Sequence, residues 1–290
     1  MNSSAKAALK VGRDDTQDVS SEINARKATD KQTHKPVHKQ IRHKLLANFP
    51  LLAFILLLAI VWEGLTRLLP IPHYIIPRLS AVLQSLVEHA PVLAKHFVIT
   101  LNESIIGLMI SVLLGSLCAL LIDSIKIAQR TLYPVIIASQ TIPIIALSPI
   151  MVMWFGYELW SKVSVVVLFT FFPITVNTIA GLRAADPDIG ELMRSMGASK
   201  GDLFWKWKLP SAVPHFFTGL KMAATISVGG ATLGEWLGSE AGLGMYTKRA
   251  SNLLQGEAVF TGVLLLSAMG IMLFLTVQLI ERIVKGERRY

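Results

Sequence analysis

Residues 183–210, RAADPDIGELMRSMGASKGDLFWKWKLP, form a polar stretch between two segments that are apolar enough to lie in a bilayer. Asp186 is a suitable N-cap and Pro187 suits the first helical position, so a helix is expected to begin there. Four apolar residues then recur at i, i+3, i+4 and i+7, which places them on one face: Ile189, Leu192, Met193 and Met196. The sequence therefore predicts a short amphipathic helix.

A second short helix is expected after Gly197, which can adopt the left-handed conformation that ends a helix. Ser199 and Asp202 have the spacing of a capping box, ahead of a helix that carries Leu203, Phe204 and Trp207. Pro210 is expected to end or sharply bend this helix. Two such helices, tethered on both sides to apolar segments, would project from the membrane as a docking knob.

The spacing of Glu191, Gly197 and the Leu209-Pro210 pair resembles the cytoplasmic loop of binding-protein-dependent ABC importer permeases. The family pattern is Glu-Ala-Ala, three residues, Gly, nine residues, Ile-x-Leu-Pro. This chain departs from it at Leu192 and Met193, where the family commonly has Ala, and at Trp207, where it commonly has Ile. The resemblance implies a coupling surface for a separate ATPase, made of Ile189, Glu191, Leu192, Met193, Met196, Gly197, Leu209 and Pro210. The alternative is an ordinary loop that contains a helix.

The composition independently indicates a membrane protein, because 52% of the residues are hydrophobic and the mean hydropathy is +0.53. Six windows are long and apolar enough to span a bilayer: 47–69, 97–122, 132–156, 160–182, 212–237 and 258–280. Pro134, Pro143 and Pro149 interrupt the third, which should be kinked or locally unwound. The predicted fold is all-α and polytopic, and the resemblance implies the MetI-like permease fold.

The distribution of cationic residues predicts the orientation, because loops rich in Lys and Arg stay in the cytoplasm. With both termini inside, 21 of the 28 Lys and Arg residues fall in cytoplasmic regions. The formal net charge of +9 then reflects topology, and no aromatic-interleaved basic patch suggests nucleic acid as a partner. The expected organisation is a disordered basic tail (1–46), a transmembrane domain (47–282) with its cytoplasmic loop (183–210), and a cytoplasmic C-terminus (283–290).

No catalytic or cofactor motif is found, so the chain is not expected to be an enzyme or to hydrolyse ATP itself. His34, His38 and His43 lack supporting carboxylates or cysteines, and no metal site is assigned. Cys118, the only cysteine, is expected to be an apolar packing residue.

The fifth window contains small and polar residues that could line a translocation path or serve helix packing. The candidates are Lys221, Thr225, Ser227, Gly229, Gly230 and Glu235. Lys221 is a functional candidate as an intramembrane charge, although its long stem could equally snorkel. Glu103 is expected to reach headgroups at the outer end of its span, and the glycine-rich segment 234–244 to form a re-entrant or outer loop.

Segments 234–244 and 70–96 resemble permeases of the nitrate, sulfonate and taurine group and of thiamine-precursor importers. The resemblance implies a bacterial inner-membrane permease, ABC ATPase subunits as a homodimer, an extracytoplasmic solute-binding protein and a second permease copy, most simply a homodimer. A membrane scaffold or sensor that anchors a cytosolic partner remains the alternative function. A membrane enzyme would require clustered acidic, His or Ser residues at one depth, and none is found.

Overall fold

The computed structural model describes residues 37–70 and 72–286, and of residues 37–49, 51 and 52 it describes only the backbone. The chain divides into two compact units, residues 1–65 and 66–290, and each is described by itself. The described part of the first unit is most of helix α2 (Val37–Leu68), which begins within the segment assigned to the tail. Of the three tail histidines, His34 lies outside the described residues, and only the backbone of His38 and His43 is described.

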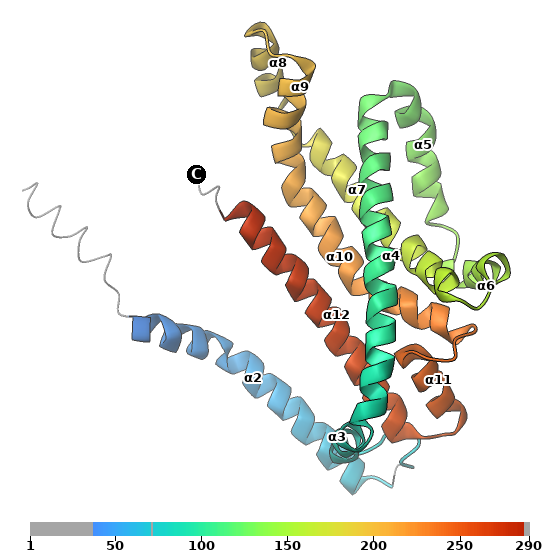
Figure 1. Cartoon of the computed structure of the whole chain (residues 1–290). Helices are drawn as coiled ribbons and strands as arrows, with labels where there is room; N and C mark the ends of the chain where they lie inside the picture. The colour runs from blue at the N-terminus through green and yellow to red at the C-terminus, as the bar shows by residue number, and fades with distance from the viewer. Residues whose placement is uncertain (1–36, 71, 287–290) are drawn as a thin grey trace, which may run out of the picture. The chain divides into compact units, whose positions relative to one another are not determined.

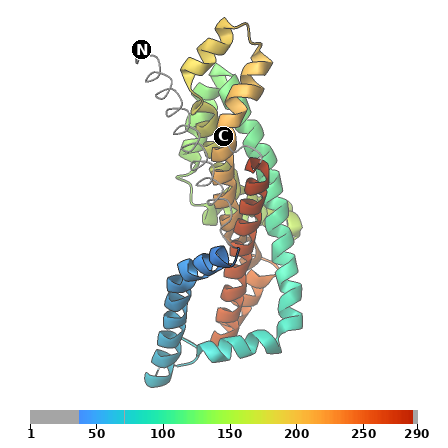
Figure 2. The ribbon, with the colours of Figure 1, turned by 90° about the vertical axis from the view of Figure 1, so that its left-hand side faces the viewer.

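The second unit is a bundle of helices, with no strand among its described residues. Its long helices are α4 (Ala90–Ser124), α7 (Leu159–Arg183), α10 (Leu209–Trp236) and α12 (Gly256–Lys285). Short helices α3 (Leu79–Glu88) and α11 (Leu243–Asn252) lie at one end of the bundle, as Figures 1 and 2 show. Helices α8 (Pro187–Ser195) and α9 (Lys200–Leu203) lie at the other. These are called the α11 end and the α8 end below.

Among the described residues, α4, α7 and α12 are each long and apolar enough to cross a membrane. Helices α5 (Lys126–Ser139) and α6 (Ile144–Phe155) meet the same test together, with a bend of 100° between them. The break lies just before Pro143, which confirms the predicted interruption there, whereas Pro134 and Pro149 lie inside α5 and α6 and do not break them. The windows 47–69 and 212–237 fall on α2 and α10, and the count of six spans stays a prediction.

Close packing in the bundle centres on α7 and α10, where glycines let the backbones approach. A Cβ on Gly219 would lie 2.5 Å from the Pro173 carbonyl oxygen, and one on Gly230 would lie 3.0 Å from Cα of Val166. On α4, a Cβ at Gly107 would lie 2.5 Å from the Val166 side chain. Gly219 and Gly230 of the fifth window therefore serve helix packing, whereas a Cβ on Gly229 would meet nothing within 4 Å.

Candidate coupling loop and membrane sites

The first helix of the polar loop begins and ends as its sequence predicts. Helix α8 starts at Pro187, and the Asp186 carboxylate caps it by accepting a hydrogen bond from the Asp188 amide at 2.9 Å. Gly197 has φ +84° after the C-terminal turn. The Gly197 amide donates to Arg194 O and the Ala198 amide to Met193 O, both at 3.0 Å, which is a Schellman motif. Both ends of α8 are therefore fixed by hydrogen bonds.

The second helix begins with the predicted capping box, in which Ser199 Oγ accepts from the Asp202 amide at 3.1 Å and the Asp202 carboxylate accepts from the Ser199 amide. Lys206 Nζ and Ser199 Oγ also donate to this carboxylate, at 2.5 and 2.6 Å. These contacts stabilise the ionised form, with Lys206 the largest contribution, and lower the pKa of Asp202 to about 2.

Pro210 does not end this helix, which corrects the sequence prediction. A π-helical turn (Phe204–Lys208) joins α9 to α10 without interruption, and Pro210 lies in the first turn of α10. The wider turn lets the Leu209 amide reach Phe204 O, so the helix can accommodate a proline ring that an α-helical register would oppose. The loop is thus a direct extension of α10.

Trp207, where the family pattern has Ile, lies in the π-helical turn and packs against α8. Its indole Nε1 donates to Asp186 O at 2.9 Å. Its ring lies against buried Gly190, where a Cβ would be 2.6 Å from the indole carbon Cη2. Trp207 therefore fixes the angle of α8 on the end of α10.

The apolar face of α8 is not covered by any part of the chain that the structure describes. Ile189, Leu192 and Met196 are 50%, 60% and 78% exposed, and Met193 is partly exposed. Glu191 is exposed beside them. A helix whose backbone is fixed and whose apolar face is open has the properties of a docking element.

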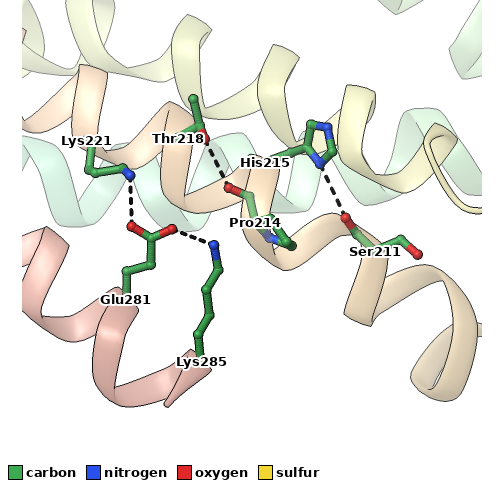
Figure 3. A network of polar contacts seen from close by, with 7 residues as sticks. All are labelled: Ser211, Pro214, His215, Thr218, Lys221, Glu281 and Lys285. Carbon is green, nitrogen blue, oxygen red and sulfur yellow. Dashed lines mark hydrogen bonds and ion pairs between the residues drawn. The ribbon is translucent and has the colours of Figure 1, made fainter. Parts of the chain in front are cut away.

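Two ion pairs hold α10 to its neighbours, and both were missed in the sequence because the partners are far apart along the chain. Lys208 Nζ lies 2.7 Å from Asp123 Oδ2, at the end of α4. Lys221 Nζ lies 2.8 Å from Glu281 Oε2 on α12, and Lys285 approaches the other oxygen of that carboxylate at 2.6 Å (Figure 3). The intramembrane charge of Lys221 is therefore paired.

Glu235, a candidate for the path, lies in the last turn of α10 with 1% exposure, and its carboxylate meets the start of α11. Its carboxylate accepts hydrogen bonds from Thr100 Oγ1 at 2.6 Å, from the Gly244 amide at 2.5 Å and from the Met245 amide at 3.2 Å. Thr100 Oγ1 in turn accepts from the Leu243 amide at 2.8 Å, and His96 Nδ1 accepts from the Gly242 amide at 3.0 Å.

Four consecutive amides, those of residues 242–245, are thus satisfied by side chains from α4 and α10. They belong to the first turn of α11, whose N–H groups have no partner within the helix. The carboxyl oxygens, which accept these hydrogen bonds, also lie at the positive end of the helix dipole. This arrangement, the Glu235 clasp (His96, Thr100, Glu235 and the amides of 242–245), ties the glycine-rich segment to α4.

Glu103 does not reach headgroups, which is the second correction. Helix α4 begins at Ala90, seven residues before the predicted window, so Glu103 lies well inside it and is 2% exposed. Glu235 and Lys162 are the charged groups with which it interacts. Its Oε2 is the one buried side-chain polar atom without a hydrogen bond among the described residues. The carboxyl group belongs to the interior beside the clasp.

An open apolar groove of about 830 Å³ runs along α10 and α12. Of the six predicted path residues, Thr225 and Gly229 line it, one turn apart on the same face of α10. Ser227, Gly230 and Glu235 are buried on other faces, and Lys221 is held by Glu281. The structure therefore brings together two of the six and separates the rest from them.

Taken together, the helical bundle, the exposed helix at its end and the groove indicate a membrane transport component. The chain belongs to the family described as "binding-protein-dependent transport system inner membrane component", whose model matches residues 111–286. Members of this class are membrane subunits of ABC transporters and are not enzymes.

Individual relatives agree with this family. The chain is 41% identical over 236 residues, 81% of its length and 94% of the relative's, to the formylaminopyrimidine transport permease protein ThiX of Halalkalibacterium halodurans. It is 26% identical to the taurine transport system permease protein TauC of Escherichia coli, over 77% of this chain and 83% of TauC.

Solved structures support the fold alone. A chain of the inward-facing MetNI methionine ABC transporter superposes with a TM-score of 0.59 at 18% identity, covering 68% of this chain and 98% of that one. The predicted MetI-like, all-α fold is thus confirmed.

Proposed function

We propose that this chain is the permease subunit of an ATP-driven importer and that α8 docks on a separate ATPase subunit. One observation carries the coupling role: the apolar face of α8 is exposed although hydrogen bonds fix both ends of the helix. Ile189, Leu192, Met193 and Met196 would fill a groove on the ATPase, and Glu191 would form an ion pair beside it.

The remaining loop residues would transmit force. Gly197 provides the turn between α8 and α9, and Leu209 and Pro210 begin the transmembrane part of α10. Because the π-helical turn makes the knob continuous with α10, movement of the ATPase would tilt α10 as a body. This role places the α8 end and both termini in the cytoplasm, in agreement with the distribution of Lys and Arg.

The cargo is proposed to be a formylaminopyrimidine or a similar pyrimidine precursor of thiamine, delivered by an external binding protein. The 41% identity to ThiX over almost its whole length supports this choice over sulfonate, taurine or nitrate. A second permease copy would face the groove of α10 and α12, and Thr225 and Gly229 would line the path between the copies.

The test is uptake by a strain that lacks this gene, supplied with labelled formylaminopyrimidine or labelled taurine. The wild-type gene should restore uptake of the pyrimidine only. Glu191→Lys and Gly197→Val should insert into the membrane but lose uptake and co-purification with the ATPase. Valine at φ +84° is strained by about 1 to 2 kcal/mol, because its branched Cβ meets the backbone.

Gly201→Ala is the matched control, because a Cβ there has open space apart from Ser199 Oγ at 3.7 Å. Restored uptake of taurine instead of the pyrimidine would overturn the cargo. Normal ATPase association by both loop variants would overturn the coupling role while leaving the cargo open to the uptake result.

A further inference from the structure

A pocket of about 410 Å³ lies at the α8 end, between the start of α5 and the end of α7. Five residues line it: Lys126, Gln129, Arg130, Tyr133 and Arg183. Three of them are cationic, and no carboxylate lines the pocket. The residues from α5 are spaced at i, i+3, i+4 and i+7, so they share one face of the helix. The pocket is therefore a concentrated positive site.

The cations of this pocket are not neutralised within the described residues. Arg183 stacks on the Tyr133 ring, with its guanidinium carbon 4.9 Å from the ring centroid, which leaves the in-plane N–H groups available. The carboxylate nearest along the chain, Asp123, is paired with Lys208, and Asp186 caps α8. The three charges are exposed, so the pocket is open to an anion from outside the chain.

The positive-inside bias explains why cations occur at this end but not why three of them, from two helices, converge on one cavity. An apolar cluster of Ala119, Ile122, Ile136 and Ile179 packs directly beneath and holds α4, α5 and α7 together. One turn beyond Tyr133, on the same face of α5 as the pocket residues, Ile137 is 43% exposed. A charged cavity that adjoins an exposed apolar surface matches a ligand with an anionic head and an acyl tail.

We propose that this pocket binds the phosphate group of an anionic phospholipid in the leaflet at the α8 end. Basic pockets between helices on the cytoplasmic side of membrane proteins bind phosphate headgroups, and each Lys or Arg near the surface adds about 1 kcal/mol, or about fivefold in affinity. Arg183 ends α7 three residues before Asp186, so a bound headgroup would brace the base of the coupling loop.

The test measures binding of phosphatidylglycerol to the full-length chain, purified in a mild detergent, by native mass spectrometry. Phosphatidylcholine, which has the same tails but no net charge, and inorganic phosphate are the comparison ligands. Wild-type protein should bind phosphatidylglycerol at least about tenfold more tightly than either, because headgroup and tails both contribute. Tight binding of inorganic phosphate alone would overturn the lipid as the source of the phosphate.

Lys126→Gln and Arg130→Gln should each weaken phosphatidylglycerol binding about fivefold. The triple variant, which also carries Arg183→Gln, should weaken it more strongly. The matched control is Arg194→Gln with Lys200→Gln and Arg282→Gln, which removes three exposed cations that do not line the pocket. An equal loss in this control would reduce the effect to general surface charge and overturn the proposal. Unchanged lipid binding by the single and triple pocket variants, with lost ATPase association, would assign the pocket to a protein partner instead.

Discussion

At the scale of single residues, Thr100 is the central residue of the Glu235 clasp, because its hydroxyl donates to the Glu235 carboxylate and accepts from the Leu243 amide. Thr100→Val keeps the shape of the side chain but leaves a buried amide and a buried carboxylate oxygen each short of one partner. We expect a loss of about 2 to 3 kcal/mol in the free energy of unfolding. Thermal unfolding in detergent measures it as a lower midpoint.

Thr100→Ser should restore most of the stability, since it keeps the hydroxyl. Thr276→Val is the matched control, because Thr276 is exposed and its hydroxyl bonds only to the preceding turn of its own helix. A midpoint for Thr100→Val equal to that of Thr276→Val would mean that the clasp does not stabilise the fold.

Asp202 gives the coupling loop a defined response to acid. Its pKa is lowered to about 2 in the folded loop, against an ordinary value of about 3.9. A lowered pKa contributes stability that is present above about pH 4 and is lost as the pH falls through about 2. Hydrogen exchange of the 199–206 amides, corrected for intrinsic rates, should be constant from pH 8 to pH 5 and accelerate below pH 4.

Asp202→Asn cannot ionise, so its exchange should be faster at neutral pH and show no additional step between pH 4 and pH 2. The same acid step in this variant would mean that another carboxylate is responsible.

Residue identity predicted the local chemistry of the loop and little of the long-range pairing. Asp186, Gly197 and Ser199 act within a few residues of themselves, so propensity and spacing are sufficient to place them. Glu235 meets Thr100 across 135 positions, and Lys221 meets Glu281 across 60. No periodicity in a single sequence reports such pairs, which is why Glu235 was assigned to a path.

At the scale of elements, the packing of Gly190 on Trp207 sets how α8 stands on α10. Gly190→Ala would place a Cβ 2.6 Å from the indole, so either the ring or the helix must move. Helix propensity alone favours this substitution by about 1 kcal/mol. We nevertheless expect uptake and ATPase association to fall severalfold while the amount of inserted protein stays unchanged, which transport assays and co-purification measure.

Gly201→Ala makes the same chemical change in α9, where a Cβ has room, and should leave both readouts near wild type. Equal behaviour of the two variants would show that the angle of α8 does not matter for coupling.

Helix ends were predicted well where a proline breaks the helix directly. They were predicted poorly where a π-helical turn lets the helix continue through the proline. Pro143 breaks the third window as expected: tight turns at residues 140–142 end α5, and Pro143 has extended backbone ahead of α6. Pro210 does not end its helix, because the π-helical turn before it removes the conflict. Helix α11 was missed altogether: its amphipathic stretch is short, and its first turn is satisfied by side chains from α4 and α10.

At the scale of the whole molecule, the number of spans and the orientation make one joint prediction. Single cysteines in a Cys118→Ala background report on which side each loop lies, through labelling by a reagent that cannot cross the membrane. We expect cysteines at Ser3, Ser124 and Lys200 to label only from the cytoplasm, and those at Glu158 and Glu240 only from outside. This pattern follows from the distribution of Lys and Arg together with six spans.

The pairs of positions separate the possible failures. Ser124 and Glu158 flank the α5–α6 pair, so labelling from the same side would make this bent pair a re-entrant loop instead of a span. Ser3 and Lys200 are separated by four predicted spans, and labelling from opposite sides, with Ser124 and Glu158 as expected, would mean that α2 does not cross. Lys200 and Glu240 flank α10, whose paired Lys221 and clasped Glu235 make the crossing possible despite two charges. Labelling of those two positions from one side would overturn the permease topology itself.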